Sequence, residues 1–273
     1  MATLSYHEQK DIENIKKLRE LQKELPSFCS DFFRGIETST STRTRIAYAY
    51  DLKIFFQFLK TANPGTFDNP SHTLTPSDLE KLTVTDLEEY IDYLKCHPSD
   101  TNEDVINTER GLMRKVSSLR SFYSYFFRNE RIEKNPAALV RMPKLHEKEI
   151  IRLEIDEVAK LLDEVEEGDK LTEKQKLYHE RTKVRDLAMM SLLLGTGIRV
   201  SECVGLNIND IDLDTCGARV YRKGGKESVI YFSDEVRDVL EDYLDEREMI
   251  DAVPGNEDAL FLSMQRKRIN VRS

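Results

Sequence analysis

The feature that most constrains the fold is an apolar helical run, residues 187–194, that ends in a Gly-Thr-Gly turn at residues 195–197. The turn delivers Arg199 to the start of another helix, which carries Glu202 three residues on. A guanidinium is a planar fork of donors suited to phosphate oxygens, and a helix N-terminus adds unpaired amides and a positive dipole end. The segment therefore predicts an anion site, with phosphate chemistry as the first hypothesis.

Composition limits the chain to globular domains and argues against a membrane protein. It has 273 residues, of which 39% are hydrophobic and 33% charged. No window approaches the roughly 20 apolar residues of a membrane span, and no signal-peptide pattern is visible. The four cysteines lie far apart without a C-x-x-C pair, so neither a zinc site nor a disulfide framework is indicated. We expect a cytoplasmic protein of two domains.

Helical periodicity predicts a bundle of four to five helices in residues 1–149. The expected helices cover residues 8–24, 42–59, 85–94 and 105–128, with a loop at 61–73. An extended, charged linker is expected from Asn135 onward, and we place the domain boundary near residue 149.

The sequence pattern of residues 150–273 predicts a mixed α/β domain that is mainly helical. Helices are expected at residues 153–162 and 184–194. A short helix is expected to follow the Arg199 turn and end at Leu206, and a further helix is expected to begin after Ser233. Residues 218–222 and 228–232 alternate with period two around a Lys-Gly-Gly-Lys turn, which is typical of a β-hairpin. The fold class is thus mainly α with a small sheet.

The segment around Arg199 resembles the first catalytic box of the tyrosine site-specific recombinases, the phage-integrase and Xer family. In that family a Thr-Gly-hydrophobic-Arg-hydrophobic-Ser-Glu run carries an active-site arginine. Asn-Asp-Ile-Asp at 209–212 resembles the tract before the family's hairpin, and Lys223 resembles the hairpin lysine that reaches the active site. Further matches to the N-terminal domain are Ser41, Thr44, Tyr48, Asp51, Leu52, residues 119–123 and Asn135-Pro136.

The resemblance implies that residues 1–149 form an N-terminal DNA-binding (core-binding) domain and that residues 150–273 form the N-terminal part of the catalytic domain. It implies roles for three residues of the second domain. Arg199 would clamp the oxygens of a scissile phosphate, Glu202 would orient Arg199, and Lys223 would protonate the leaving 5′-hydroxyl, with Lys226 as its rival. It also implies no metal or nucleotide cofactor, and double-stranded DNA as partner of a homotetramer on two sites. The alternatives are a structural Arg199–Glu202 ion pair and a solvent-exposed hairpin lysine.

The family's His-x-x-Arg box and tyrosine nucleophile have no match in this sequence. All five histidines precede Arg199, and the three tyrosines after it, Tyr221, Tyr231 and Tyr243, lie too close to it to match the nucleophile. We therefore expect a recombinase whose catalytic domain is incomplete at its C-terminus and which is inactive alone.

The net charge of −9 is an objection to DNA binding, since phosphate neutralisation normally needs a basic surface. Positive charge is nevertheless concentrated at 42–45 and 111–120. We expect Arg114, Lys115 and Ser118 to lie on a helix flank away from the apolar stripe, where a merely solvated face is the alternative. The expected DNA contacts are Arg43, Thr44, Arg45, Arg114, Lys115 and Ser118.

Other classes of function stay open at this level. The chain could be a non-catalytic DNA-binding module that occupies a recombination site, a type IB topoisomerase, or a helical interaction scaffold supported only by the acidic balance. The sequence names neither the target site nor the choice between chromosome-dimer resolution and mobile-element integration.

Overall fold

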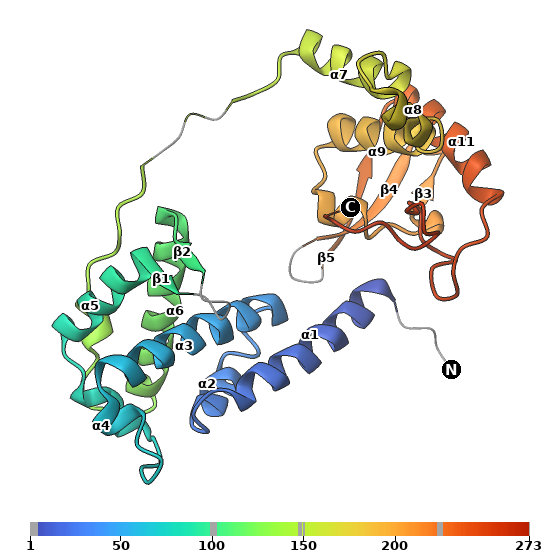
Figure 1. The fold of residues 1–273 in the computed structure, drawn as a ribbon. Coiled ribbons are helices and arrows are strands. Elements are labelled where there is room, and N and C mark those ends of the chain that lie inside the picture. The colour runs from blue at the N-terminus through green and yellow to red at the C-terminus, as the bar shows by residue number, and fades with distance from the viewer. Residues whose placement is uncertain (1–4, 99–102, 147–148, 150, 223–225, 273) are drawn as a thin grey trace. The chain divides into compact units, whose positions relative to one another are not determined.

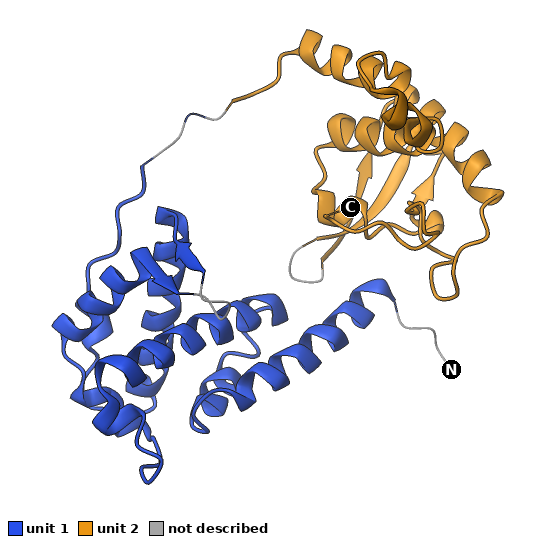
Figure 2. Cartoon of the chain, viewed as in Figure 1, with its two compact units in different colours: residues 1–149 blue, residues 150–273 orange. Residues whose placement is uncertain are grey.

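The chain divides into two compact units, residues 1–149 and residues 150–273 (Figure 2). The computed structural model describes residues 5–98, 103–146, 149, 151–222 and 226–272. Among these residues, no helix is long and apolar enough to cross a bilayer.

The first unit is a bundle of helices with one short hairpin (Figure 1). Strand β1 (Cys96–Pro98) pairs antiparallel with β2 (Asp104–Ile106) between the last two helices. Two 3₁₀ turns, η1 (Pro76–Lys81) and η2 (Pro136–Ala138), complete the unit. The α-helices are α1 (Tyr6–Lys23), α2 (Cys29–Gly35), α3 (Thr42–Ala62), α4 (Pro64–Phe67), α5 (Val84–Lys95) and α6 (Glu109–Arg128).

Side-chain caps begin α3 and α6, the two helices that carry the predicted DNA contacts. Ser41 caps α3 by accepting a hydrogen bond of 3.2 Å from the Thr44 amide, and Thr108 caps α6 by accepting one of 3.2 Å from the Gly111 amide. Each cap satisfies an amide that the first helical turn leaves unpaired. The expected start of the 105–128 helix was therefore too early, because the chain forms β2 before Thr108.

An aromatic cluster holds α2, α3 and α6 together. Phe122 of α6 is fully buried and meets Phe32 of α2 edge-on, with ring centroids 5.2 Å apart. Phe56 of α3 meets the same Phe122 ring at 6.2 Å. Edge-to-face pairs add about 0.5–1.5 kcal/mol each beyond the area that they bury. The relative position of α3 and α6 is thus set by well-packed rings.

The second unit packs helices on a three-stranded antiparallel sheet of order β3-β4-β5 (Figure 1). Helix α9 packs against α7 and α11. The expectation of a mainly helical chain with a small sheet is confirmed. The elements are α7 (Ile155–Glu167), α8 (Glu173–His179), α9 (Lys183–Thr196), α10 (Val200–Cys203), η3 (Ile208–Asp210), β3 (Ile211–Asp212), β4 (Gly217–Arg222), β5 (Lys226–Tyr231) and α11 (Asp234–Glu248).

Three short helices, α2, α4 and α8, were not expected from the sequence, and the expected linker begins later than Asn135. Arg120 of α6 donates hydrogen bonds to the carbonyls of Ala137 and Val140. The side chain of Val140 is 2% exposed and belongs to the hydrophobic core of the first unit. The segment that follows Asn135 is therefore part of the first unit, because a side chain from α6 satisfies its backbone.

Candidate functional site

The turn that presents Arg199 depends on Gly197. Gly197 ends α9 with φ 65° and ψ 18°, the left-handed conformation, and its amide donates to the Leu193 carbonyl at 2.9 Å. Glycine adopts this conformation without the steric penalty that a Cβ brings. Ile198 is 6% exposed and anchors the turn in the core. Arg199 follows as the residue that precedes the first turn of α10.

Glu202 holds Arg199 by two hydrogen bonds. The Arg199 amide donates to Oε2 at 2.9 Å, and the guanidinium Nη1 donates to Oε1 at 2.9 Å. The Glu202 side chain is 5% exposed, whereas that of Arg199 is 66% exposed. The carboxylate is therefore fixed inside the fold while most of the guanidinium faces outward, where it can meet an anion.

Glu202 is ionised at neutral pH. Its burial acts to raise the pKa, but the hydrogen bonds from Arg199 and the nearby charges of Arg199 and Arg222 outweigh it and hold the pKa below its ordinary value. A carboxylate in this state orients its partner and does not supply a proton. The site therefore combines two arginines with one buried negative charge.

Strand β4 brings Arg222 to this site. Alternate residues of a strand point to the same face, so Arg222 shares the face of the fully buried Ala218 and Val220. Its pairing partner on β5 is Lys226, which is exposed. Lys223, the predicted general acid, lies outside the described residues.

Arg268 supports the segment that follows α10, and the sequence analysis missed it. Its Nη1 donates to the carbonyls of Val204 and Leu206 at 3.1 and 2.6 Å, and its Nη2 donates to Asn207 Oδ1 at 2.5 Å. No sequence pattern signals such a contact, because Arg268 lies more than sixty residues from its partners.

A basic groove of about 600 Å³ lies on the first unit, between the N-terminal parts of α3 and α6. Three arginines line it, and the described lining residues include no Asp or Glu. Three of the six predicted DNA contacts meet here, namely Arg43, Thr44 and Arg114. The groove is lined by Arg43, Thr44, Ala47, Tyr48, Arg110, Met113, Arg114, Ser117 and Leu145.

The expectation of an exposed flank was wrong for Lys115 and Ser118. Lys115 is 8% exposed and its Nζ donates to Asn107 Oδ1 at 2.6 Å, while Ser118 is fully buried. Helix α6 packs against α3, α2 and α5, so more of its circumference is buried than the apolar stripe indicates. Arg45 is likewise 7% exposed and pairs with Glu37 at 2.8 Å. These side chains are not presented to a ligand.

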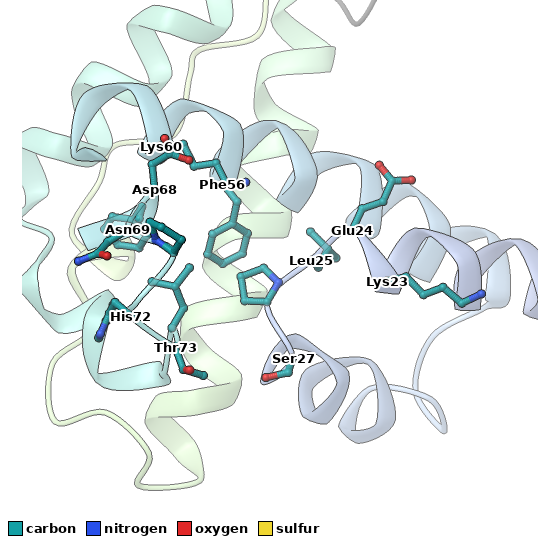
Figure 3. Close-up of a pocket in the computed structure, with 14 residues that line it drawn as sticks. Lys23, Glu24, Leu25, Ser27, Phe56, Lys60, Asp68, Asn69, His72 and Thr73 are labelled. Atoms are coloured by element: carbon teal, nitrogen blue, oxygen red, sulfur yellow. The ribbon is translucent and has the colours of Figure 1, made fainter. Parts of the chain in front are cut away.

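A separate cavity of about 440 Å³ opens near the C-terminal end of α3 (Figure 3). Phe56 points into it, with Leu25 on one side and the Asn69–His72 loop on the other. Its lining carries both signs of charge, so it does not favour an anion as the groove does. The lysines and carboxylates at its edge are Lys23, Lys60, Glu24 and Asp68.

Among the described residues, no group of three or more His, Cys, Asp or Glu side chains is placed to hold a metal ion. Two sites on the described surface are rich in arginine: the groove on the first unit and the Arg199 site on the second unit. Both favour an anion, and phosphate is the anion that suits a planar guanidinium fork.

Comparison with known proteins gives a consistent result. Residues 151–273 match the model of the phage integrase family. The chain is 35% identical over 257 residues to tyrosine recombinase XerC of Caldanaerobacter subterraneus subsp. tengcongensis, covering 91% of this chain and 66% of that protein. It is 30% identical over 277 residues to tyrosine recombinase XerS of Streptococcus uberis, covering 92% and 76%.

A solved structure of the Tn1549 transposon integrase in complex with circular intermediate DNA has a similar fold. The TM-score is 0.56 at 17% identity, and the match covers 89% of this chain and 73% of the integrase chain. The chain spans about two thirds of the length of the XerC relative.

Proposed function

This chain belongs to the tyrosine recombinase family, and we propose that it takes part in site-specific DNA recombination by strand cleavage and rejoining. The observation that carries the proposal is the outward-facing Arg199, held by an ionised and buried Glu202. A fixed cation aimed at a phosphate stabilises negative charge that develops during cleavage, at no cost of reorganisation. We propose double-stranded DNA as the substrate and a cytoplasmic location.

In this mechanism Arg199 contacts a non-bridging oxygen of the scissile phosphate, and Glu202 acts as a positioning residue. Arg222 adds positive charge beside them. Lys223 is proposed as the general acid for the leaving 5′-hydroxyl, with Lys226 as the alternative. We propose that a tyrosine nucleophile and a second arginine, neither of which is assigned to a residue of this chain, take part in cleavage, and that the enzyme acts as a homotetramer on two DNA sites.

The first unit is proposed to hold the duplex through its basic groove between α3 and α6. The cap residues Ser41 and Thr108 place two helix N-termini at this groove, and Arg43 and Arg110 lie in the first turns. Helix N-termini and unpaired arginines both favour phosphate oxygens. The groove thereby supplies a local basic surface on a chain whose net charge is −9.

A chimera tests the catalytic part of the proposal. The chimera carries residues 151–273 of this chain in place of the matching segment of the Caldanaerobacter XerC relative, and cleavage of a nicked duplex is measured as covalent protein–DNA complex. Arg199→Ala should reduce the cleavage rate by on the order of 10²-fold or more, with little change in DNA affinity. Equal rates for both proteins would refute the role of Arg199.

The second candidate function is a DNA-binding module that occupies a recombination site without cutting. It is favoured by the basic groove of the first unit, because DNA binding there needs no catalytic residue. The chain by itself should then bind duplex DNA and form no covalent complex. A covalent adduct at Tyr221, Tyr231 or Tyr243 would contradict both this candidate and our account of the active site.

A further inference from the structure

Asp51 is a buried carboxylate between α3 and α6. Its side chain is 3% exposed and accepts a hydrogen bond of 2.5 Å from Nη1 of Arg114, which lies 63 residues away in the sequence. Burial raises the pKa of Asp51, because desolvation outweighs the attraction of Arg114 and Lys115. A buried carboxylate is costly unless it is paired, so Arg114 is held firmly at this position.

The same arginine is also open to the groove. The Arg114 side chain is 46% exposed and lines the groove beside Arg43 and Arg110. Among the described residues, no acceptor is bound by its Nε or Nη2. These two N–H groups lie on one edge of the planar guanidinium and form a rigid pair of parallel donors. Asp51 thus fixes the orientation of a guanidinium whose second edge is available to a ligand.

Arg114 differs from the other two arginines of the groove in having a carboxylate bound to its guanidinium. Arg43 and Arg110 lie in the first turns of α3 and α6, and no described carboxylate forms an ion pair with either. The Asp51 carboxylate, by contrast, offsets the charge of Arg114. Phosphate binding gains from uncompensated charge through counterion release. Arg43 and Arg110 are therefore suited to phosphates, and Arg114 is suited to a neutral acceptor pair.

We propose that Arg114, positioned by Asp51, reads a guanine in the major groove, while Arg43 and Arg110 contact the DNA backbone. This inference rests on the proposed DNA binding of the first unit. Guanine offers two acceptors, O6 and N7, on its major-groove edge, and they match two parallel donors of an arginine. An arginine already held in one orientation loses less entropy when it binds. Asp51 itself touches no DNA.

Selection of duplexes from a library of randomised base pairs tests this assignment with the full chain. The unchanged chain should enrich a guanine at one position, Arg114→Gln should lose that preference, and Arg43→Gln should retain it as the matched control. Replacing the selected G·C pair by A·T should lower the affinity of the unchanged chain by roughly 5- to 150-fold. The same replacement should change the affinity of Arg114→Gln by less than about twofold.

The salt dependence of binding gives a second readout. Arg43→Gln should reduce the magnitude of the slope of log affinity against log salt by about 0.9, the value for one phosphate contact. Arg114→Gln should change this slope by clearly less than Arg43→Gln does. Asp51→Asn keeps the shape of the side chain but removes its charge, so it should weaken the guanine preference and raise the salt dependence. A purely structural role of Asp51 would move neither quantity in this way.

The outcomes separate the two levels of the proposal. An unchanged chain that binds no duplex would refute the proposed function and this inference together. A chain that binds DNA without a guanine preference, or an Arg114→Gln variant with an unaltered consensus or a slope reduced by about 0.9, would refute the inference alone. Thermal unfolding, monitored by circular dichroism, shows whether each variant is folded. If Asp51→Asn does not fold, the Arg114→Gln result alone tests the inference.

Discussion

Replacing Glu202 by glutamine should weaken the contact that orients Arg199, while the Arg199 guanidinium stays in the site. The carboxylate accepts one hydrogen bond from the Arg199 backbone amide and one from the guanidinium of Arg199, whose side chain is 66% exposed. A hydrogen bond to a buried charge contributes about 1.5–3 kcal/mol, and a solvent-exposed ion pair about 0.2–1 kcal/mol. Glutamine retains the amide contact as a neutral bond worth about 1 kcal/mol. The expected loss is therefore about 0.7–3 kcal/mol.

Thermal unfolding of the second unit measures this loss. A change of that size should lower the melting temperature by about 3–12 °C in a domain of this length. The pKa of Glu202 is lowered in the folded state, so its contribution is present above the unfolded pKa, about 4.3, and disappears as the pH falls through the folded value. The Glu202→Gln variant should lack this part of the acid destabilisation.

Catalysis gives the matching functional readout. In the chimera, Glu202→Gln should slow cleavage by about 10-fold, less than the loss of Arg199 itself, because the guanidinium remains but is less well oriented. The matched control is Glu241→Gln on α11, an exposed residue, which should change neither quantity. A Glu202→Gln protein with unchanged melting temperature and cleavage rate would show that Glu202 does not hold Arg199.

Three further substitutions test the supports of the two sites. Gly197→Ala should destabilise the second unit by about 1–2 kcal/mol in thermal unfolding, because a Cβ is strained at φ 65° although nothing lies within 4 Å of it; an unchanged melting temperature would contradict the turn geometry. Arg45→Met should lower the melting temperature but leave duplex affinity unchanged in gel shifts, since Arg45 is buried and paired with Glu37. A large loss of affinity would show that Arg45 contacts DNA after all. Arg268→Met should speed hydrogen exchange in residues 204–207 while leaving α3 protected, and unchanged exchange would exclude the proposed support.

Local chemistry in the sequence determined much of this protein. The cap at Ser41, the period-two alternation around residues 218–222 and the glycine turn before Arg199 each depend on neighbours within a few residues. Such signals are readable because the backbone preference and the partner lie in the same short segment. The Arg199–Glu202 contact belongs to this group, since it spans three residues.

Tertiary packing decided which charged side chains are available to a ligand. Lys115 and Ser118 look like an exposed flank in a helical projection, yet α6 is covered on more than one side and buries both. Arg45 is withdrawn by Glu37, and Arg114 is oriented by Asp51 from another helix. Periodicity reports one apolar face of a helix, whereas burial depends on every element that packs against it. Contacts between distant residues have no local signature, so only the folded chain reveals them.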